Sequence, residues 1–193
     1  MAMVPEVPEA PGPHGLRSTR STARATAAWI VAVLAVSVVI GLIGGLIWGE
    51  LAPRALLEEV GAGTAQVVNA ETRAFFGADV WFSGIAAVAG LLTGLLGYRF
   101  AVVPRDGAAA RAAVTAALIA GALAGGLVML WLGERIGLSG YNQHLATSAT
   151  GTLFASSLAL GSKSALAIWP LFTAIVVLVA EWSARPATEQ PPL

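Results

Sequence analysis

Four long apolar stretches, separated by polar segments, dominate the hydrophobic pattern of this chain. The first, residues 29–48, has no charged side chain, and Ser37 is its one hydroxyl-bearing residue. At the α-helical rise these residues make a rod of about 30 Å, the thickness of the hydrocarbon core of a bilayer. The pattern therefore predicts four membrane-spanning helices, at about residues 27–49, 80–103, 112–133 and 165–182, and an all-α fold in which they form a bundle.

The segments outside the spans complete the predicted layout of one membrane domain, residues 25–185, with a tail at each end. Residues 1–24 are rich in Pro, Gly, Arg and Ser and offer little to bury, so we expect a disordered cytoplasmic tail there. A second cytoplasmic tail covers residues 186–193. The two longer connections, residues 50–79 and 134–164, are expected to form a cap outside the membrane.

Each of these longer connections has one segment with a pattern of its own. Pro53 opens a stretch that we expect to form a short helix to about residue 60. Residues 152–160 are too apolar for a freely solvated loop, so we expect them either to lie on the bilayer surface or to pack on the helix ends.

The basic residues beside the spans predict the orientation of the chain. Seven lie in the two tails and in the short connection after the second span, and four lie in the two longer connections. The seven are Arg17, Arg20, Arg24, Arg99, Arg105, Arg111 and Arg185, and the four are Arg54, Arg73, Arg135 and Lys163. Because cytoplasmic flanks carry the excess of Lys and Arg, both termini are predicted to be cytoplasmic. The Arg and Ala bias is associated with bacterial genomes, so the expected location is the bacterial plasma membrane.

Glycines four residues apart indicate how the spans pack. Two glycines at this spacing share one helix face, and a face of small residues lets two backbones approach closely in lipid. We predict that such faces hold a tight bundle together. The glycines concerned are Gly41, Gly45, Gly49, Gly90, Gly94, Gly121 and Gly125.

The ends of the spans repeat a pattern. Residues 44–50 and residues 125–134 both run from a Gly-Gly pair through a Trp to a Glu, and residues 81–82 and 169–172 both begin with Trp and end with Phe. These matches predict two related helical hairpins, placed about a pseudo-twofold axis along the membrane normal. The alternative is that Gly and interfacial Trp are common at span ends in any membrane protein.

Chemistry-bearing residues are scarce. No Asp, Glu, Lys, Arg or His lies between the interfacial ends of any span, which disfavours an ion-coupled transporter. The chain has no Cys, its two His are far apart in the sequence, and it lacks the common phosphate-loop, zinc-protease and serine-hydrolase motifs. We therefore expect no enzyme activity, metal or cofactor. A net charge of zero gives no reason to expect nucleic acid as a partner.

Carboxylates and indoles gather at the predicted outer boundary of the membrane. One hypothesis is that they surround a mouth that binds a lipid headgroup, an envelope glycolipid or a partner protein. The alternative is that charged residues end the spans and that Trp forms the usual interfacial belt. The residues are Glu50, Asp79, Glu134, Trp48, Trp81 and Trp131.

Residues 44–54 contain Gly-Gly-Leu-Ile-Trp and Leu-Ala-Pro-Arg, and residues 75–82 read Phe-Phe-Gly-Ala-Asp-Val-Trp-Phe before a Gly-rich second span. This order resembles an actinobacterial family of conserved four-span membrane proteins of unknown function, over about residues 27–183. The resemblance implies the four-span topology and the plasma-membrane location, and it implies no catalytic residues.

These observations favour a non-enzymatic integral membrane protein of the bacterial cell envelope. Its expected role is that of an accessory or scaffold, acting through helix packing and the outer cap, in contact with membrane lipid and with another membrane protein or a second copy of itself. The alternatives are a small transporter or permease subunit, and a membrane protein or enzyme that binds lipid through the outer-face carboxylates.

Overall fold

The computed structural model of the protein describes residues 13–61, 64–68, 73–105, 107–147, 149 and 151–184. Four long helices alternate with short strands, and a π-helical turn (η1) and a 3₁₀ turn (η2) adjoin two of the helices. In chain order the elements are α1 (Pro13–Leu51), β1 (Leu56–Gly61), β2 (Thr64–Val67), α2 (Ala74–Gly97), η1 (Tyr98–Val102), α3 (Ala108–Thr147), β3 (Leu153–Ala155), η2 (Lys163–Ala167) and α4 (Ile168–Ser183).

Four helical segments are long and apolar enough to cross a membrane, which confirms the predicted all-α membrane bundle. They are Ala23–Leu51, Phe76–Val102, Ala108–Ile136 and Lys163–Ser183. A helix needs about 20 apolar residues to cross the hydrocarbon core, and the shortest of the four has 21 residues.

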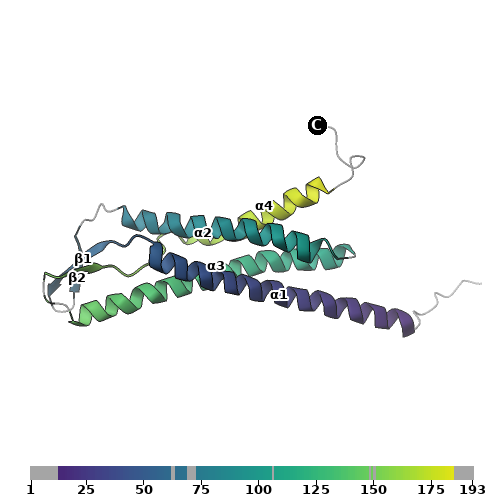
Figure 1. The fold of residues 1–193 in the computed structure, drawn as a ribbon, viewed down its shortest axis with the longest axis horizontal. Coiled ribbons are helices and arrows are strands. Elements are labelled where there is room, and N and C mark those ends of the chain that lie inside the picture. The colour runs from purple at the N-terminus through teal and green to yellow at the C-terminus, as the bar shows by residue number, and fades with distance from the viewer. Residues whose placement is uncertain are drawn as a thin grey trace, which may run out of the picture.

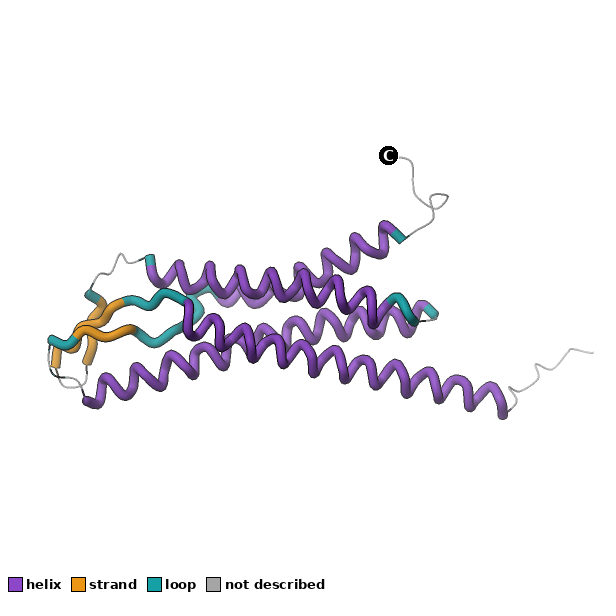
Figure 2. Tube along the Cα trace, viewed as in Figure 1, coloured by secondary structure: helices purple, strands orange, loops and turns teal. Residues whose placement is uncertain are grey.

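The four helices lie side by side with a small sheet at one end (Figures 1 and 2). α1 and α3 run toward the sheet, and α2 and α4 run away from it (Figure 1). α1 packs mainly on α3, and α2 packs mainly on α4. The bundle therefore consists of two parallel helix pairs. We call the sheet and residues 156–162 the cap, and we call the opposite end of the bundle, where α1 begins and α4 ends, the basal end.

The N-terminal segment differs from the prediction. α1 begins at Pro13, so residues 13–24 are helical and not disordered as we expected, while residues 1–12 and 186–193 lie outside the described part of the chain. The physical reason is that extending an existing helix avoids the cost of nucleating a new one. Ala and Arg, which are frequent just before the first span, are also strong helix formers.

The cap differs from the prediction in both connections. α3 continues to Thr147 instead of ending near residue 133, so the second connection is shorter than the predicted 134–164. Within residues 50–79, the expected short helix over residues 53–60 is wrong, because β1 and β2 form an antiparallel hairpin there. β1 also pairs antiparallel with β3, which gives the sheet order β2-β1-β3.

The apolar segment at residues 152–160 packs on the helix ends, which was one of its two expected positions. Phe154, Leu158 and Leu160 are buried. Leu158 and Leu160 join the main core together with Trp48 and Phe82 from the cap end of the bundle. The cap and the bundle thus share one hydrophobic core.

The seven glycines predicted to form packing faces all lie at helix contacts. A Cβ atom on Gly41 would collide with the backbone of Gly125, and one on Gly90 would lie 2.7 Å from the carbonyl oxygen of Trp169. Close backbone approach of this kind leaves no room for a side chain. Gly41, Gly45, Gly49, Gly121 and Gly125 join α1 to α3, and Gly90 and Gly94 join α2 to α4.

The matching span ends do not occupy matching environments. Trp48 is 0% exposed, whereas its counterpart Trp131 is 55% exposed. Trp169 is 1% exposed, whereas Trp81 is 44% exposed. In each matching pair, one Trp is buried and the other is exposed. The packing therefore gives no support to two related hairpins.

Replacing Gly125 by Ala should destabilise the bundle, because the new methyl group would lie 2.7 Å from the Ser37 carbonyl oxygen and 2.7 Å from a Trp169 ring carbon. Backbone atoms cannot move aside as a flexible side chain can, so we expect a loss of about 1–3 kcal/mol. Thermal unfolding in detergent micelles measures it.

Gly84→Ala is the matched control for this variant. It removes a glycine from the same kind of helix interior, but nothing lies within 4 Å of the added Cβ. We expect its melting temperature to equal or exceed that of the parent chain, because Ala favours the helix. Equal melting temperatures for Gly84→Ala and Gly125→Ala would contradict the packing role of Gly125.

Candidate functional site

Two of the three outer carboxylates hold the cap onto the bundle. Asp79, in the second turn of α2, accepts hydrogen bonds from the backbone N–H groups of Gly161 (2.9 Å) and Ser162 (3.0 Å). Glu134, on α3, accepts a longer bond of 3.5 Å from the backbone N–H of Leu160. Side chains of α2 and α3 therefore both bind the backbone of residues 160–162 in the cap. The third carboxylate, Glu50, is exposed at the end of α1.

The three outer indoles also have different roles. Trp48 is fully buried, donates a hydrogen bond of 2.8 Å from Nε1 to the Ala78 carbonyl, and meets the Phe82 ring edge-on at 5.2 Å. Trp81 and Trp131 are exposed, and the guanidinium of Arg135 lies over the Trp131 ring. Trp48, Asp79 and Glu134 thus belong to the junction between cap and bundle, whereas Glu50, Trp81 and Trp131 lie on the exterior. The six residues do not surround one mouth.

Sequence reasoning missed a polar network at the contact between α2 and α4. Trp169 donates a hydrogen bond of 3.0 Å from Nε1 to the Thr93 hydroxyl, which itself donates to the Ala89 carbonyl at 2.8 Å. The Thr173 hydroxyl lies 3.1 Å from the Thr93 hydroxyl and donates to the Gly90 carbonyl at 3.2 Å. These buried groups satisfy one another, so the network fastens two helices together.

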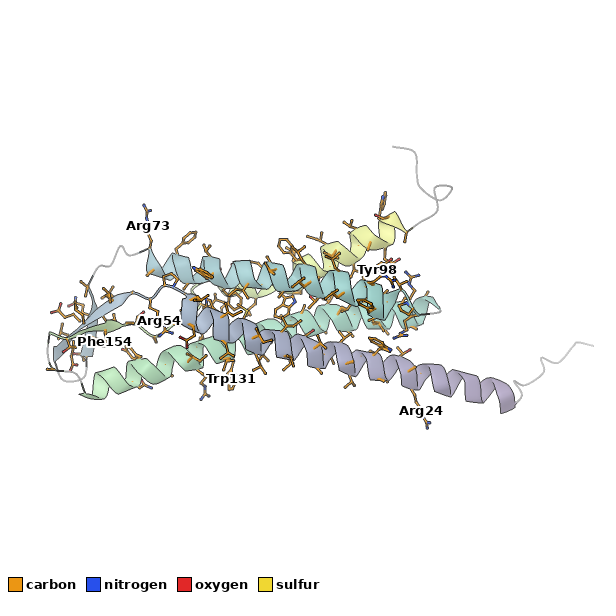
Figure 3. The ribbon with its side chains drawn as sticks, in the orientation of Figure 1. Arg24, Arg54, Arg73, Tyr98, Trp131 and Phe154 are labelled. Carbon is orange, nitrogen blue, oxygen red and sulfur yellow. The ribbon has the colours of Figure 1, made fainter. Side chains whose placement is uncertain are left out.

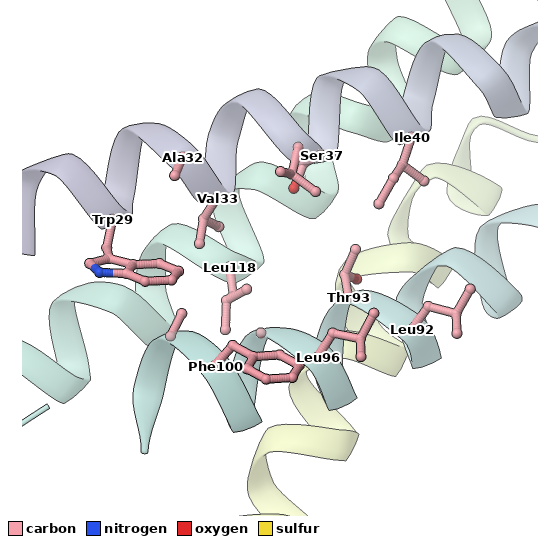
Figure 4. Close-up of a pocket in the computed structure, with 13 residues that line it drawn as sticks. Trp29, Ala32, Val33, Ser37, Ile40, Leu92, Thr93, Leu96, Phe100 and Leu118 are labelled. Carbon is pink, nitrogen blue, oxygen red and sulfur yellow. The ribbon is translucent and has the colours of Figure 1, made fainter. Parts of the chain in front are cut away.

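A groove of about 270 Å³ runs along the seam between α1 and α2. Trp29, Val33 and Ile40 contribute one wall, from α1, and Leu96 and Phe100 contribute the other. Figure 4 shows Trp29 toward one end of this groove and Ile40 and Leu92 toward the other. The polar side-chain groups of the lining residues are the hydroxyls of Ser37 and Thr93 and the indole N–H of Trp29.

A second apolar hollow of about 540 Å³ extends the groove toward the cap. The two hollows share Ile40 and Leu92. The second is walled by Ile43 and Ile47 of α1 and by Val88 of α2. α1 and α2 therefore stand apart over much of their length, in contrast to the closed α1–α3 and α2–α4 contacts.

Comparison with known proteins adds no family to this picture. No protein-family profile, curated protein or solved structure matches the chain. The membrane assignment accordingly rests on the four apolar helices, and the resemblance to an actinobacterial four-span family stays a prediction. Within the described ranges, no three His, Asp or Glu side chains are close enough together to hold a metal ion.

Replacing Asp79 by Ala should detach residues 161–162 of the cap from α2. The backbone N–H groups of Gly161 and Ser162 would lose their acceptor. We expect their hydrogen exchange to accelerate about tenfold relative to the parent chain. Hydrogen–deuterium exchange with mass spectrometry of peptides covering residues 158–164 measures the effect.

Glu50→Ala is the control for this experiment, because it removes an exposed carboxylate from the same end of the bundle. Its exchange profile over residues 158–164 should match that of the parent chain. If Glu50→Ala accelerates exchange there as much as Asp79→Ala, the assignment of Asp79 as the anchor is wrong.

Proposed function

We propose that the protein is a non-enzymatic accessory or scaffold protein of the bacterial plasma membrane, with both termini in the cytoplasm and the cap outside. Support for this orientation comes from the charges at the two ends of the bundle. Among the described residues, six Arg lie toward the basal end and four basic residues lie toward the cap: Arg17, Arg20, Arg24 (Figure 3), Arg99, Arg105 and Arg111 against Arg54, Arg73, Arg135 and Lys163. The cytoplasmic side of a membrane protein carries the excess of Arg and Lys.

The observation that carries this proposal is the rigid attachment of the cap. The Arg54 side chain donates a hydrogen bond to the Gly49 carbonyl at the end of α1, and the Ser156 N–H donates to the Ala55 carbonyl at 2.8 Å. The Ser156 bond extends the pairing of β1 with β3, and the Arg54 bond ties the residues before β1 to α1. Asp79 and Glu134 tie residues 160–162 to α2 and α3, so the cap is attached to three helices. A surface on such a sheet is held in a defined position above the membrane, as a scaffold requires.

The outward face of the sheet is the surface that a partner would contact. Leu56, Glu58 and Val60 alternate along β1 on the exposed face, and Leu153 of β3 pairs with Glu58. The side chains of Leu56, Val60 and Leu153 are each more than half exposed. Exposed apolar side chains grouped on an extramembrane surface are typical of protein contact sites.

The chemistry of this face specifies its partner. Glu58 lies between Leu153 of β3 and Gln66 of β2, with the apolar Leu56 and Val60 on either side of it along β1. The complementary surface is therefore an extracytoplasmic protein segment that offers apolar side chains and a Lys or Arg. The alternative functions gain less support. The buried hydroxyls of Thr93 and Thr173 donate to the backbone carbonyls of Ala89 and Gly90, and Thr93 accepts from Trp169, which leaves no polar lining there for a transported solute. Asp79 and Glu134 already accept backbone hydrogen bonds, so the outer carboxylates do not favour a lipid site.

A photo-crosslinker at position 153 should capture one discrete protein in membranes of the native host. The Glu58→Lys exchange should lower the yield of that adduct at least about tenfold, because it places like charges opposite each other in the contact. Gel electrophoresis and mass spectrometry of the adduct measure its yield and its composition.

Glu50→Lys makes the same charge change at an exposed residue outside the sheet face and should leave the yield unchanged. An adduct that persists in the Glu58→Lys chain would contradict the proposed contact. An adduct with twice the mass of the chain would replace the accessory role by self-association through the cap.

A further inference from the structure

A groove open to the bilayer must be filled, because no water is available there and an empty apolar groove forfeits its dispersion contacts. The groove of Figure 4 has apolar walls and a volume of about 270 Å³, close to the lower end of the range for ligand sites. A lipid acyl chain has the shape and the chemistry to fill it. The charge at its basal end decides which lipid is favoured.

Arg105 supplies that charge. Its guanidinium lies 4.9 Å from the centre of the Trp29 ring, and Trp29 lines the basal end of the groove. Nε and Nη2 of Arg105 are buried, and among the described residues no acceptor lies within hydrogen-bond distance of either. Buried donors without an acceptor are costly. The third nitrogen of the guanidinium, Nη1, is not among these buried atoms, so a phosphate in the hollow that Arg105 lines would meet the guanidinium at Nη1.

The space beside Arg105 is large enough for a headgroup. A hollow of about 800 Å³ at the basal end is lined by Arg105, Arg111, Thr115 and Glu181. Arg111 forms an ion pair of 2.6 Å with Glu181, so its charge is already balanced. Among the residues that the structure describes, Arg105 has no carboxylate partner. Among the described residues that line this hollow, the positive charge that no ion pair balances is that of Arg105.

The depth of Arg105 also suits a lipid phosphate. The apolar helical segment ends at Val102, three residues before Arg105, so the guanidinium lies at the boundary between hydrocarbon and headgroups. Basic pockets between helices at this depth recognise anionic lipids.

We propose that the basal end of the protein binds one anionic phospholipid, with the phosphate on Arg105 and one acyl chain in the groove between α1 and α2. Trp29 joins the two halves of the site, because its ring contacts the guanidinium and also lines the groove. The site lies at the opposite end of the bundle from the cap, so it does not depend on the proposed role of the sheet.

The test compares lipids retained by the full chain after extraction from vesicles of equal parts phosphatidylglycerol and phosphatidylcholine. Native mass spectrometry should find one phosphatidylglycerol per chain, bound in about fivefold excess over phosphatidylcholine. In Arg105→Gln the ratio should fall to about one. Arg24→Gln loses the same charge from an exposed residue of α1 at the same end and should keep the parent ratio. Arg105→Lys keeps the charge and should keep an anionic preference, which separates loss of binding from loss of folding.

A second pair of variants tests the acyl-chain half of the site. Ala32 is exposed and lines the groove, so Ala32→Phe fills it without entering the core and should lower retention of both lipids. Ala35→Phe adds the same side chain to an exposed position of α1 away from the lining and should retain lipid as the parent chain does.

Four outcomes would overturn the proposal. They are equal retention of the two lipids by the parent chain, an unchanged ratio in Arg105→Gln, full retention in Ala32→Phe, and a second protein subunit seated along α1 and α2 in place of lipid. Displacement of phosphatidylglycerol by millimolar inorganic phosphate would assign the Arg105 hollow to a soluble phosphate instead.

Discussion

Close approach of helix backbones is the constraint on which the rest of this structure depends. In lipid, apolar side chains gain nothing by leaving their surroundings for one another, so helices associate where their backbones and hydrogen-bonding groups can meet. Such close backbone contacts join Gly41 to Gly125 and Gly90 to Trp169. At the second contact, Trp169 donates to the Thr93 hydroxyl and Thr173 donates to the Gly90 carbonyl, which adds two buried hydrogen bonds between the helices.

This constraint also explains why one side of the bundle stays open. The glycine faces of α1 look toward α3, and those of α2 look toward α4. The seam between α1 and α2 also contains glycines, Gly44, Gly84 and Gly97, but none of them meets the backbone of the other helix. Glycine contacts to backbone therefore close the α1–α3 and α2–α4 pairs, and a lateral groove remains between α1 and α2.

The elements that were predictable from the sequence are those that depend on nearby residues. A span is recognised from about 20 consecutive apolar residues, and a packing face from glycines four apart. β1 pairs with β2, which follows it directly, and also with β3, whose Phe154 lies nearly 100 positions later in the chain. The second pairing depends on residues that are far apart in the sequence. The contact between Arg105 and Trp29 likewise joins residues from different spans. The predicted mouth of six outer residues does not form for a related reason. The sequence gives no sign that the backbone of residues 160–162 binds Asp79 and Glu134.

The Trp residues show why residue type alone does not assign a role in a membrane protein. An indole has a large apolar body and one N–H group, so it can sit at the interface or within the bundle if the N–H finds an acceptor. Trp48 donates a hydrogen bond to the Ala78 carbonyl, and Trp169 donates one to the Thr93 hydroxyl. Both indoles are buried. Trp81 and Trp131 begin or end spans in the same way but remain on the exterior. The acceptor on a neighbouring helix, supplied by the fold, therefore decides which indoles stabilise the bundle and which face the membrane boundary.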